Sequence, residues 1–244
     1  MTEINKDTLY AQPHDSISGF QFNDEVADVF SDMIRRSVPG YATILHMIGQ
    51  LSERYAQNNT TIYDLGCSLG GATLAMRRRV KASNTPIYGV DNSEAMLHRC
   101  QKMIDADDSQ VSVELIHSDL QTLAFKPSSV MVMNFVLQFI PIHDRQALLK
   151  RIADSLVEKG IFILSEKICF DDATHNQLMI ELHHNFKRSN GYSDLEVAQK
   201  RNALEDVLIP ESMQEHQDRL LSAGFKRVEC WFQCFNFMSL VARK

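Results

Sequence analysis

The chain has 244 residues, of which 44% are hydrophobic and 23% charged, and its formal net charge at pH 7 is −6. This composition is typical of a globular enzyme with a substantial core, and no apolar run approaches the roughly 20 residues that a membrane-spanning helix needs. The acidic balance also argues against a protein that holds nucleic acid mainly through phosphate contacts, because such contacts need a basic surface.

The cysteines indicate a reducing compartment. Their number is odd and no Cys-x-x-Cys pair occurs, so the spacing indicates neither a zinc site nor a redox dithiol. The polar, acidic residues 1–7 do not resemble a signal peptide. We therefore expect reduced thiols, a cytoplasmic protein, no membrane association and no bound metal. The five cysteines are Cys67, Cys100, Cys169, Cys230 and Cys234.

Two helices are expected before the first strand. Residues 1–22 are polar and predict an arm or loop. Apolar residues then recur at helical spacing over residues 23–38 and 41–55, on either side of the break at Pro39-Gly40. Because both helices precede the first strand, we interpret residues 1–58 as a helical cap and not as a separate domain.

The middle of the chain alternates strands with helices, which predicts a parallel sheet with helices on both faces. We interpret residues 61–167 as the ligand-binding core. Within it, strands are expected at 61–65, 87–90, 111–116, 130–133 and 161–164, and helices at 70–81, 93–105 and 142–157, the last closed by Lys159-Gly160.

The last third of the chain predicts a helical insertion followed by a strand pair. The insertion is expected over residues 171–222, with its final helix ending at Gly224. Residues 225–244 predict two strands joined by a tight connection around Gln233-Cys234 and paired antiparallel at one edge of the sheet. The fold class is therefore a single α/β domain, with a mostly parallel seven-stranded sheet and an antiparallel edge strand.

The stretch from Ile62 to Thr73 predicts a strand, a tight turn and a helix N-terminus. Free backbone N–H groups of such a turn suit a ligand with negative or polar groups. Gly66 allows close approach of the backbone, and Asp64 is expected to bond turn amides or a ligand amine. The full Gly-x-Gly-x-x-Gly dinucleotide pattern and a P-loop are both absent from the sequence.

Polar residues end the later strands, and in a parallel sheet these ends meet at one cleft. Asp91 can accept both ribose hydroxyls, with a helix-capping acid as the alternative. Asp119 can accept from the adenine amine while the N–H of Leu120 meets a ring nitrogen, and Asn134 offers a donor and an acceptor to an amino-acid group. S-adenosyl-L-methionine fits this set better than NAD or ATP.

Several runs carry a family resemblance that covers nearly the whole chain. Tyr63–Gly71, Gly89–Asn92 and Asp119-Leu120 resemble the Rossmann-like class I S-adenosylmethionine-dependent methyltransferase fold. More specific runs are similar to the carboxy-S-adenosyl-L-methionine synthase family: Arg36–Tyr41, Asn134–Phe139, Leu164–Lys167, His183–Tyr192, Ala198–Arg201 and Trp231–Phe237.

The resemblance implies an activity and a site. The family converts S-adenosyl-L-methionine and prephenate to carboxy-S-adenosyl-L-methionine and phenylpyruvate, and its product feeds a tRNA carboxymethyltransferase that makes 5-oxyacetyl uridine at the wobble position. It also implies a homodimer in which Arg201 reaches the neighbouring subunit's ligand and meets its extra carboxylate. The implied ligand contacts are Tyr41, Gly66, Cys67, Ser68, Asp91, Asn92, Asp119, Leu120, Asn134 and Arg201.

The residues by themselves leave alternatives open. Tyr41 can be a packing aromatic, Arg201 a residue on a solvated helix face, and His183 and His184 surface or packing residues, so no base for removal of a methyl proton is identified. Leu120 stands where the family can carry Ile, which is harmless for a backbone contact. The alternative function is an S-adenosylmethionine-dependent methyltransferase acting on a small molecule, which has no need of Arg201. A regulatory module that binds an adenosyl ligand is a third reading.

Overall fold

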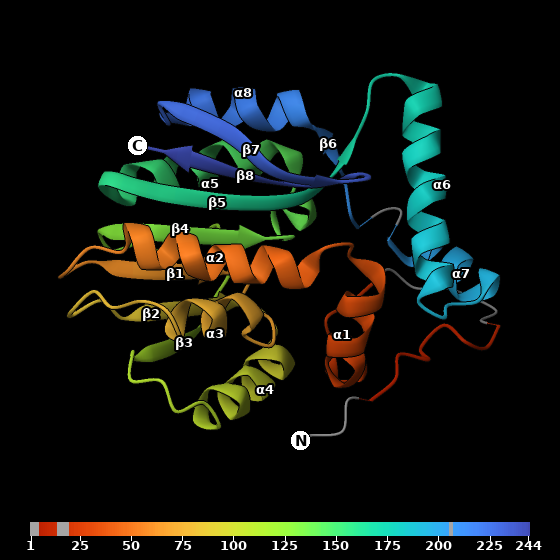
Figure 1. The fold of residues 1–244 in the computed structure, drawn as a ribbon, viewed down its shortest axis with the longest axis horizontal. Helices are drawn as coiled ribbons and strands as arrows, with labels where there is room; N and C mark the ends of the chain where they lie inside the picture. Colours follow the sequence, from red (N-terminus) through yellow and green to blue (C-terminus); the bar gives the residue numbers. More distant parts are fainter. Residues whose placement is uncertain (1–4, 14–19, 205–206) are drawn as a thin grey trace.

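The computed structural model describes residues 5–13, 20–204 and 207–244. Its centre is one mixed sheet with helices on both faces (Figure 1), and the strand order along the main path is β3-β2-β1-β4-β5-β8-β7. The strands are β1 Thr61–Leu65, β2 Ile87–Asp91, β3 Val113–His117, β4 Ser128–Asn134, β5 Leu156–Cys169, β7 Arg227–Cys234 and β8 Phe237–Arg243.

Strand order reverses between β1 and β4. From β1 the chain moves outward through β2 to β3, then returns to the other side of β1 and continues through β4 to β5. These five strands are parallel. Their carboxyl ends therefore diverge around the β1–β4 boundary, which is where ligands bind in open α/β sheets.

Two layers of helices cover the sheet. In β4, Val130 and Val132 join the core beneath α2 and α3, whereas Met131 and Met133 join the core beneath α5 and α8. Because successive strand residues face opposite sides, a strand buried on both faces is apolar throughout. The helices are α1 Asp24–Ser37, α2 Tyr41–Tyr55, α3 Gly71–Arg77, α4 Glu94–Asp105, α5 Ile142–Ser155, α6 Ala173–Ser189, α7 Asp194–Leu204 and α8 Met213–Ala223.

Two segments far apart in sequence meet beyond the carboxyl ends of the central strands. Helix α1 lies there with α6 and α7, the first two helices of the predicted insertion (Figure 1). Arg36 of α1 donates from Nε to the carbonyl of Asn190, which follows α6, at 2.8 Å. The predicted arm over residues 1–22 falls partly outside the described residues, since residues 14–19 are not described.

Most predicted elements are confirmed, and α2 and β1 have the predicted bounds. Helix α4 begins after Ser93, whose Oγ accepts the N–H of Met96 at 3.2 Å. Helix α3 is shorter than predicted, since it begins at Gly71 and ends at Arg77.

The predicted end of the helix before β5 is wrong. Helix α5 ends at Ser155, and Lys159-Gly160 lies inside a strand much longer than expected. Lys159 has φ 63°, and the pairing register between β5 and β4 shifts at this point. The pair thus forms a bulge in β5 and not a helix C-cap.

The antiparallel strand pair is confirmed at the predicted edge, with differences in detail. Its turn is at Phe235-Asn236, two residues later than expected. Strand β8 is the one that runs against its neighbours, and it lies between β5 and the outermost strand β7. A short strand that was not predicted, β6 (Glu211–Ser212), pairs with the end of β5.

Candidate active site

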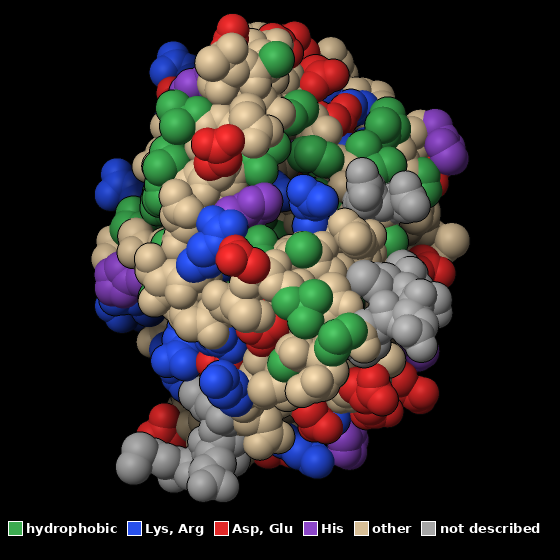
Figure 2. Space-filling model, turned by 90° about the vertical axis from the view of Figure 1, so that its right-hand side faces the viewer, with side chains coloured by type: hydrophobic (Ala, Val, Ile, Leu, Met, Phe, Trp, Pro, Cys, Tyr) green, Lys and Arg blue, Asp and Glu red, His purple; other side chains and the backbone are tan. Residues whose placement is uncertain are grey.

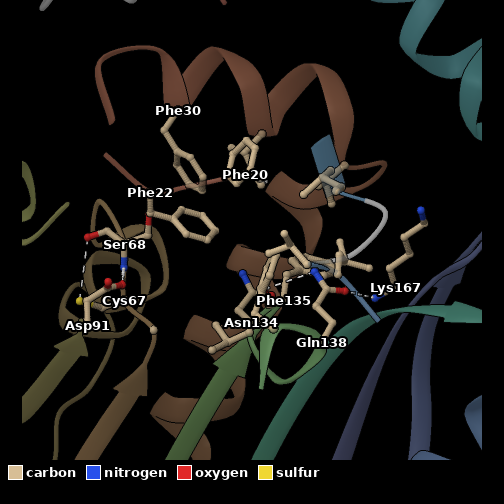
Figure 3. Close-up of a pocket in the computed structure, with 18 of the residues that line it drawn as sticks. Phe20, Phe22, Phe30, Cys67, Ser68, Asp91, Asn134, Phe135, Gln138 and Lys167 are labelled. Carbon is tan, nitrogen blue, oxygen red and sulfur yellow. Dashed lines mark hydrogen bonds between the residues drawn. The ribbon is translucent and has the colours of Figure 1, made fainter. Parts of the chain in front are cut away.

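A cavity of about 410 Å³ opens at the carboxyl ends of the central strands, beneath α1 (Figure 3). It contains nine of the ten predicted site residues and lacks Arg201. Their role as ligand contacts stays a prediction. The nine are Tyr41, Gly66, Cys67, Ser68, Asp91, Asn92, Asp119, Leu120 and Asn134.

The turn after β1 is held by its own N–H groups. Gly66 and Cys67 both donate to the carbonyl of Val90, at 2.8 and 2.9 Å, and Ser68 donates to Oδ2 of Asp91 at 2.8 Å. The expectation that free N–H groups of this turn face a ligand is therefore wrong for these three residues. Their hydrogen bonds instead fix the turn to the end of β2 and orient Asp91.

Gly66 is required by its backbone and by its neighbour. It has φ 78°, a conformation that favours glycine. A Cβ at this position would lie only 2.4 Å from Cγ2 of Val136, in the segment after β4. The turn after β1 and the segment after β4 thus approach each other closely at the floor of the cavity.

Asp91 has the helix-capping role that the sequence offered as an alternative, and its contact with a ribose stays a prediction. Its Oδ1 accepts the N–H of Ser93 at 2.9 Å, so it stabilises the start of α4, and its carboxylate also lines the cavity. Burial raises the pKa of Asp91, and the backbone N–H groups of Ser93, Ser68 and Asn92 oppose that shift. Each carboxylate oxygen can accept more than one hydrogen bond, so Asp91 can still accept from a ribose.

The ends of β2 and β3 are linked across the cavity mouth. Asn92 donates from Nδ2 to Oδ1 of Asp119 at 3.0 Å. Leu120 follows with its side chain buried in the main core. Because the side chain of Leu120 packs in the core, the backbone of Asp119 and Leu120 is held at the cavity. The predicted contact with adenine requires the backbone to lie there.

Asn134 presents an unsatisfied acceptor at the end of β4. Its Oδ1 is buried and has no hydrogen-bond partner among the described residues, and its side chain lies between Ser68 and Gln138 in the cavity (Figure 3). Buried polar atoms are nearly always paired, so an orphaned amide oxygen is well suited to a ligand's ammonium group. This observation fits the amino-acid part of S-adenosyl-L-methionine.

Buried Asp64 and half-buried Tyr41 lie beneath the turn. Oδ2 of Asp64 accepts the hydroxyl of Thr73 at 2.6 Å, which partly confirms its expected role, because Thr73 also supplies a backbone N–H. Burial raises the pKa of Asp64 to about 6. Burial first, and then the charge of Asp64, raise the pKa of Tyr41. Tyr41 lines the cavity and also packs against the α2–α3 core.

Aromatic rings form the roof of the cavity. Phe22 packs edge-on against Phe20, Phe30 and Phe139, with ring centroids 5.1 to 6.2 Å apart. In Figure 3, Phe20, Phe22 and Phe30 extend from α1 and the segment before it and lie above Ser68 and Asp91. These rings supply the apolar lining that is usual for a nucleoside site.

A buried carboxylate holds the segment after β4. Glu166 in β5 is fully buried and accepts the N–H groups of Val136, Leu137 and Gln138, at 3.2, 2.8 and 3.1 Å. Burial raises its pKa, whereas these N–H groups and the charge of Arg145 lower it. Glu166 does not line the cavity, so it acts by positioning residues that do.

The opposite end of the cavity is basic, and this was not predicted. Lys167 of β5, Lys187 of α6 and Lys200 of α7 all line it. Lys167 rises on the far side of the cavity from Ser68 and Asp91 (Figure 3). On the face that carries α1, α6 and α7, basic and histidine side chains border a hollow (Figure 2). Only the family motifs signalled these lysines, since three of the six family-specific runs each contain one of them.

The two histidines of α6 differ in environment. His183 is buried and lines the cavity, its Nε2 lies 2.8 Å from the carbonyl of Ser37, and its ring packs against Phe237. Because a carbonyl only accepts, Nε2 carries the proton. Burial and the charges of nearby lysines lower the pKa of His183, and the pKa of half-buried His184 to about 4. Packing is thus confirmed for His183, which also contacts the cavity.

Arg201 is exposed on α7 and is not among the described residues that line the cavity of its own chain. Its neighbour Lys200 is buried and faces inward. Successive helix residues point about 100° apart, so the two side chains cannot share one direction.

No group of three or more His, Cys, Asp or Glu side chains is placed to hold a metal ion within residues 5–13, 20–204 and 207–244. All five cysteines are free. None of the described helices is both long and apolar enough to cross a membrane.

Known proteins resemble the chain at two levels. The methyltransferase domain family matches residues 62–160. Among solved structures, an O-methyltransferase family protein from Burkholderia thailandensis aligns with TM-score 0.64 and 16% identity, over 91% of this chain and 60% of that one. Magnesium protoporphyrin IX methyltransferase from Synechocystis aligns with TM-score 0.59 and 15% identity, over 87% and 86% of the two chains. At these identities the likeness concerns the fold alone.

Relatives by sequence are much closer. A carboxy-S-adenosyl-L-methionine synthase of Colwellia psychrerythraea is 51% identical over 244 residues, which is all of both chains. One of Aliivibrio salmonicida is 50% identical over 240 residues, or 98% of this chain and 99% of the relative.

The sheet order, the switch-point cavity and the structural relatives define a class I S-adenosylmethionine-dependent methyltransferase fold. Within that class the sequence match is specific and spans the full length. The chain belongs to the carboxy-S-adenosyl-L-methionine synthase family, and it is an enzyme of the transferase class.

Proposed function

We propose that the chain converts S-adenosyl-L-methionine and prephenate to carboxy-S-adenosyl-L-methionine and phenylpyruvate. The observation that carries this proposal is the full-length identity of about half to synthases of that name. The cavity supports it, because its acidic and amide groups suit a nucleoside and an ammonium group and its opposite end suits an anion.

The reaction is balanced without an oxidant or reductant. Prephenate loses carbon dioxide and hydroxide as its ring becomes aromatic. The hydroxide, or a base of the protein, takes a proton from the S-methyl group and leaves a sulfonium ylide. The ylide carbon then forms a bond to carbon dioxide and gives the carboxymethyl sulfonium. Water would quench the ylide by protonation, so the aromatic roof around Phe22 has a direct use in excluding it.

Adenosyl binding is proposed for the strand ends. Asp91 accepts the ribose hydroxyls, Asp119 and the backbone of Leu120 meet adenine, and Asn134 Oδ1 accepts from the ligand's ammonium group. Gly66, Cys67, Ser68, Asn92 and Tyr41 shape the surface on which the ligand lies.

We also propose a homodimer in which Arg201 completes the neighbouring subunit's site. Its exposure and its position outside the cavity of its own chain support a role in trans. An arginine forms a bidentate pair with a carboxylate, which the product has on its transferred carbon and S-adenosyl-L-methionine has not. The product then serves a tRNA carboxymethyltransferase that modifies the wobble uridine, and the reaction takes place in the cytoplasm.

Mass spectrometry of ligand released from the purified protein, and of the reaction with prephenate, tests the function. We expect a species heavier than S-adenosyl-L-methionine by one carbon dioxide, together with phenylpyruvate. Finding only S-adenosyl-L-methionine or S-adenosylhomocysteine, with methylation of an added small molecule, would establish the methyltransferase alternative. Absence of any turnover alongside tight ligand binding would favour a regulatory module.

A further inference from the structure

Three lysines from three separate elements form one wall of the cavity, which we call the lysine wall: Lys167, Lys187 and Lys200. Lys187 and Lys200 are only 7% and 5% exposed as whole residues. Lysine is almost never buried to this extent without a partner, because removing an ammonium group from water is costly. It therefore matters which of the three lysines has an acidic partner within the protein.

Only Lys200 has an acidic partner among the described residues. Its Nζ lies 3.5 Å from Oδ2 of Asp7 and 3.3 Å from Oγ of Ser37. The same Asp7 oxygen accepts the hydroxyl of Tyr192 at 2.5 Å. For Lys167 and Lys187, no ion pair or side-chain hydrogen bond is found within the described part of the chain.

The ammonium groups of Lys200 and Lys167 act on Lys187. Burial first, and then the charges of Lys200 and Lys167, lower the pKa of Lys187 to about 7. Burial likewise lowers the pKa of Lys200 to about 8 and lowers that of Lys167. All three side chains line the same cavity, and the effect of two of them on Lys187 agrees with their lying around one space. An anion bound in that space would offset both the cost of burying the ammonium groups and the repulsion between them.

The charges of the wall indicate the class of anion. Three ammonium groups face one carboxylate, Asp7, which leaves two positive charges without a partner. The methionine part of S-adenosyl-L-methionine carries a single carboxylate, so it would neutralise only half of this excess. A ligand with two carboxylates would neutralise all of it.

The surroundings of the wall indicate an unsaturated or aromatic carbon skeleton. Phe135 and Phe237 also line the cavity, with ring centroids 5.8 Å apart, and the His183 ring packs edge-on against Phe237 at 4.8 Å. Phe135 lies between the adenosyl end and Lys167 (Figure 3). A ring that bears carboxylates would pack against these faces with its charged groups toward the lysines.

We propose that Lys167 and Lys187 bind the two carboxylates of the carboxyl donor, and that Lys200 with Asp7 holds the wall in place. This inference rests on the proposed function and identifies its donor subsite as specific for a dicarboxylate. The subsite lies across the cavity from Asp91, so the donor would approach the ligand from its sulfonium side.

The test compares two substitutions at the wall with one matched control. Lys167→Gln and Lys187→Gln are each assayed for KM with prephenate, kcat, and Kd for S-adenosyl-L-methionine. The control is Lys102→Gln, because Lys102 is exposed on α4 outside the cavity. Loss of a hydrogen bond to a charged group corresponds to roughly a 10- to 100-fold rise in KM. We expect that rise in both wall variants, with Kd for S-adenosyl-L-methionine within about threefold of the parent.

A second measurement separates binding from a structural role. Lys187→Met removes an unpaired buried charge, so we expect its unfolding temperature without ligand to equal or exceed the parent value while its KM for prephenate rises. Phenylpyruvate, with one carboxylate, serves as the probe of charge specificity. In the parent protein prephenate should bind at least about tenfold more tightly than phenylpyruvate, and both wall variants should lose that preference.

Several outcomes would overturn the proposal. An unchanged KM in both variants would remove the donor subsite, provided that the parent makes the carboxylated product. A weakened Kd for S-adenosyl-L-methionine with an unchanged KM would assign the lysines to its amino-acid carboxylate. A fall in kcat alone would assign them to proton transfer. If the parent itself makes no carboxylated product, the proposed function fails, which is a different result from any of these.

Discussion

The two ends of the cavity are built in different ways. At the adenosyl end, Asp91 and Asp119 stand at the tips of strands, and hydrogen bonds from Ser68 and Asn92 fix their carboxylates. At the lysine wall, the ammonium groups of Lys167 and Lys187 have no such partners among the described residues. The two carboxylates at the adenosyl end thus have hydrogen-bond partners before a ligand binds, whereas the two ammonium groups at the other end have none among the described residues.

The contrast indicates which part of the molecule specifies the reaction. The adenosyl end belongs to the sheet and its switch point, and solved methyltransferase structures that are 15–16% identical to this chain share that fold. The lysine wall draws two of its three lysines from α6 and α7, outside the sheet. We therefore propose that binding of S-adenosyl-L-methionine depends on the common fold, and choice of the donor on α6 and α7.

Asp91→Ala should have the largest effect, because it removes the acceptor for both ribose hydroxyls. Two hydrogen bonds to a charged group contribute about 3 kcal/mol or more, so Kd for S-adenosyl-L-methionine should rise at least about 100-fold by calorimetry. The exposed Asp108→Ala on the loop after α4 is the control. A change below about threefold would show that the ribose lies elsewhere.

Arg201→Ala should abolish most carboxylated product while leaving Kd for S-adenosyl-L-methionine nearly unchanged. Loss of a bidentate arginine–carboxylate pair costs about 2 kcal/mol, or roughly 30-fold in kcat/KM. Mixed dimers of Arg201→Ala and Asp91→Ala subunits sharpen this test. If Arg201 acts across the interface, each mixed dimer has one site with neither substitution and activity returns. If it does not return, Arg201 either acts within its own subunit or has no part in the site.

Donor binding should weaken as pH rises. Because burial lowers the pKa of Lys187 to about 7, its ammonium is present below that pH and is lost above it. We expect KM for prephenate to rise about tenfold between roughly pH 6.5 and 8.5, since both donor carboxylates stay ionised there. The other charged or titratable groups around it are Lys167 of β5, Lys200 of α7, His183 and His184 of α6, and Asp7.

The Lys187→Met variant is the control for this pH profile. Burial lowers the pKa of His183 and His184 out of this range, so neither contributes a charge change. Lys200, with a pKa of about 8, should add a smaller rise in KM at the alkaline end of the profile. A profile that keeps its full slope in Lys187→Met would assign the dependence to another group.

Asn134→Ala should have the smallest effect, and it should change stability and ligand affinity in different ways. Its buried Oδ1 has no partner among the described residues, so removal of the amide should leave the unfolding temperature unchanged or raise it. Affinity for S-adenosyl-L-methionine should nevertheless fall about tenfold, because the ligand's ammonium group loses an acceptor. Calorimetry and thermal unfolding measure the two effects, and a fall in both would indicate a structural role instead.

The periodicity of the sequence was enough for the elements and for the residues at the strand ends. Short apolar strands that end in Asp91 or Asn134 are local patterns, and a parallel sheet brings their ends together whatever the details of packing. The bulge at Lys159-Gly160 could not be read in the same way. A glycine there fits both a helix C-cap and a strand bulge, and only the pairing of β5 with β4 distinguishes them.

The hydrogen bonds of the turn after β1 likewise depend on a neighbouring strand and not on the local sequence. The local pattern leaves the N–H groups of Gly66 and Cys67 free, but the end of β2 supplies the carbonyl of Val90 to both. The sequence therefore identified the turn and its glycine correctly and misjudged what its backbone contacts. Such contacts come from residues about 25 positions away, which periodicity does not describe.

By itself the sequence determined the α/β fold, the residues that meet at the strand ends and, through its motifs, the family. Only the tertiary structure decided that Lys167, Lys187 and Lys200 line one cavity and that Arg201 is exposed and does not line it. The reason is physical. Strand and helix periodicity specify which face of an element is apolar, whereas an excess of charge in a cavity depends on which elements meet there and on how much water they exclude.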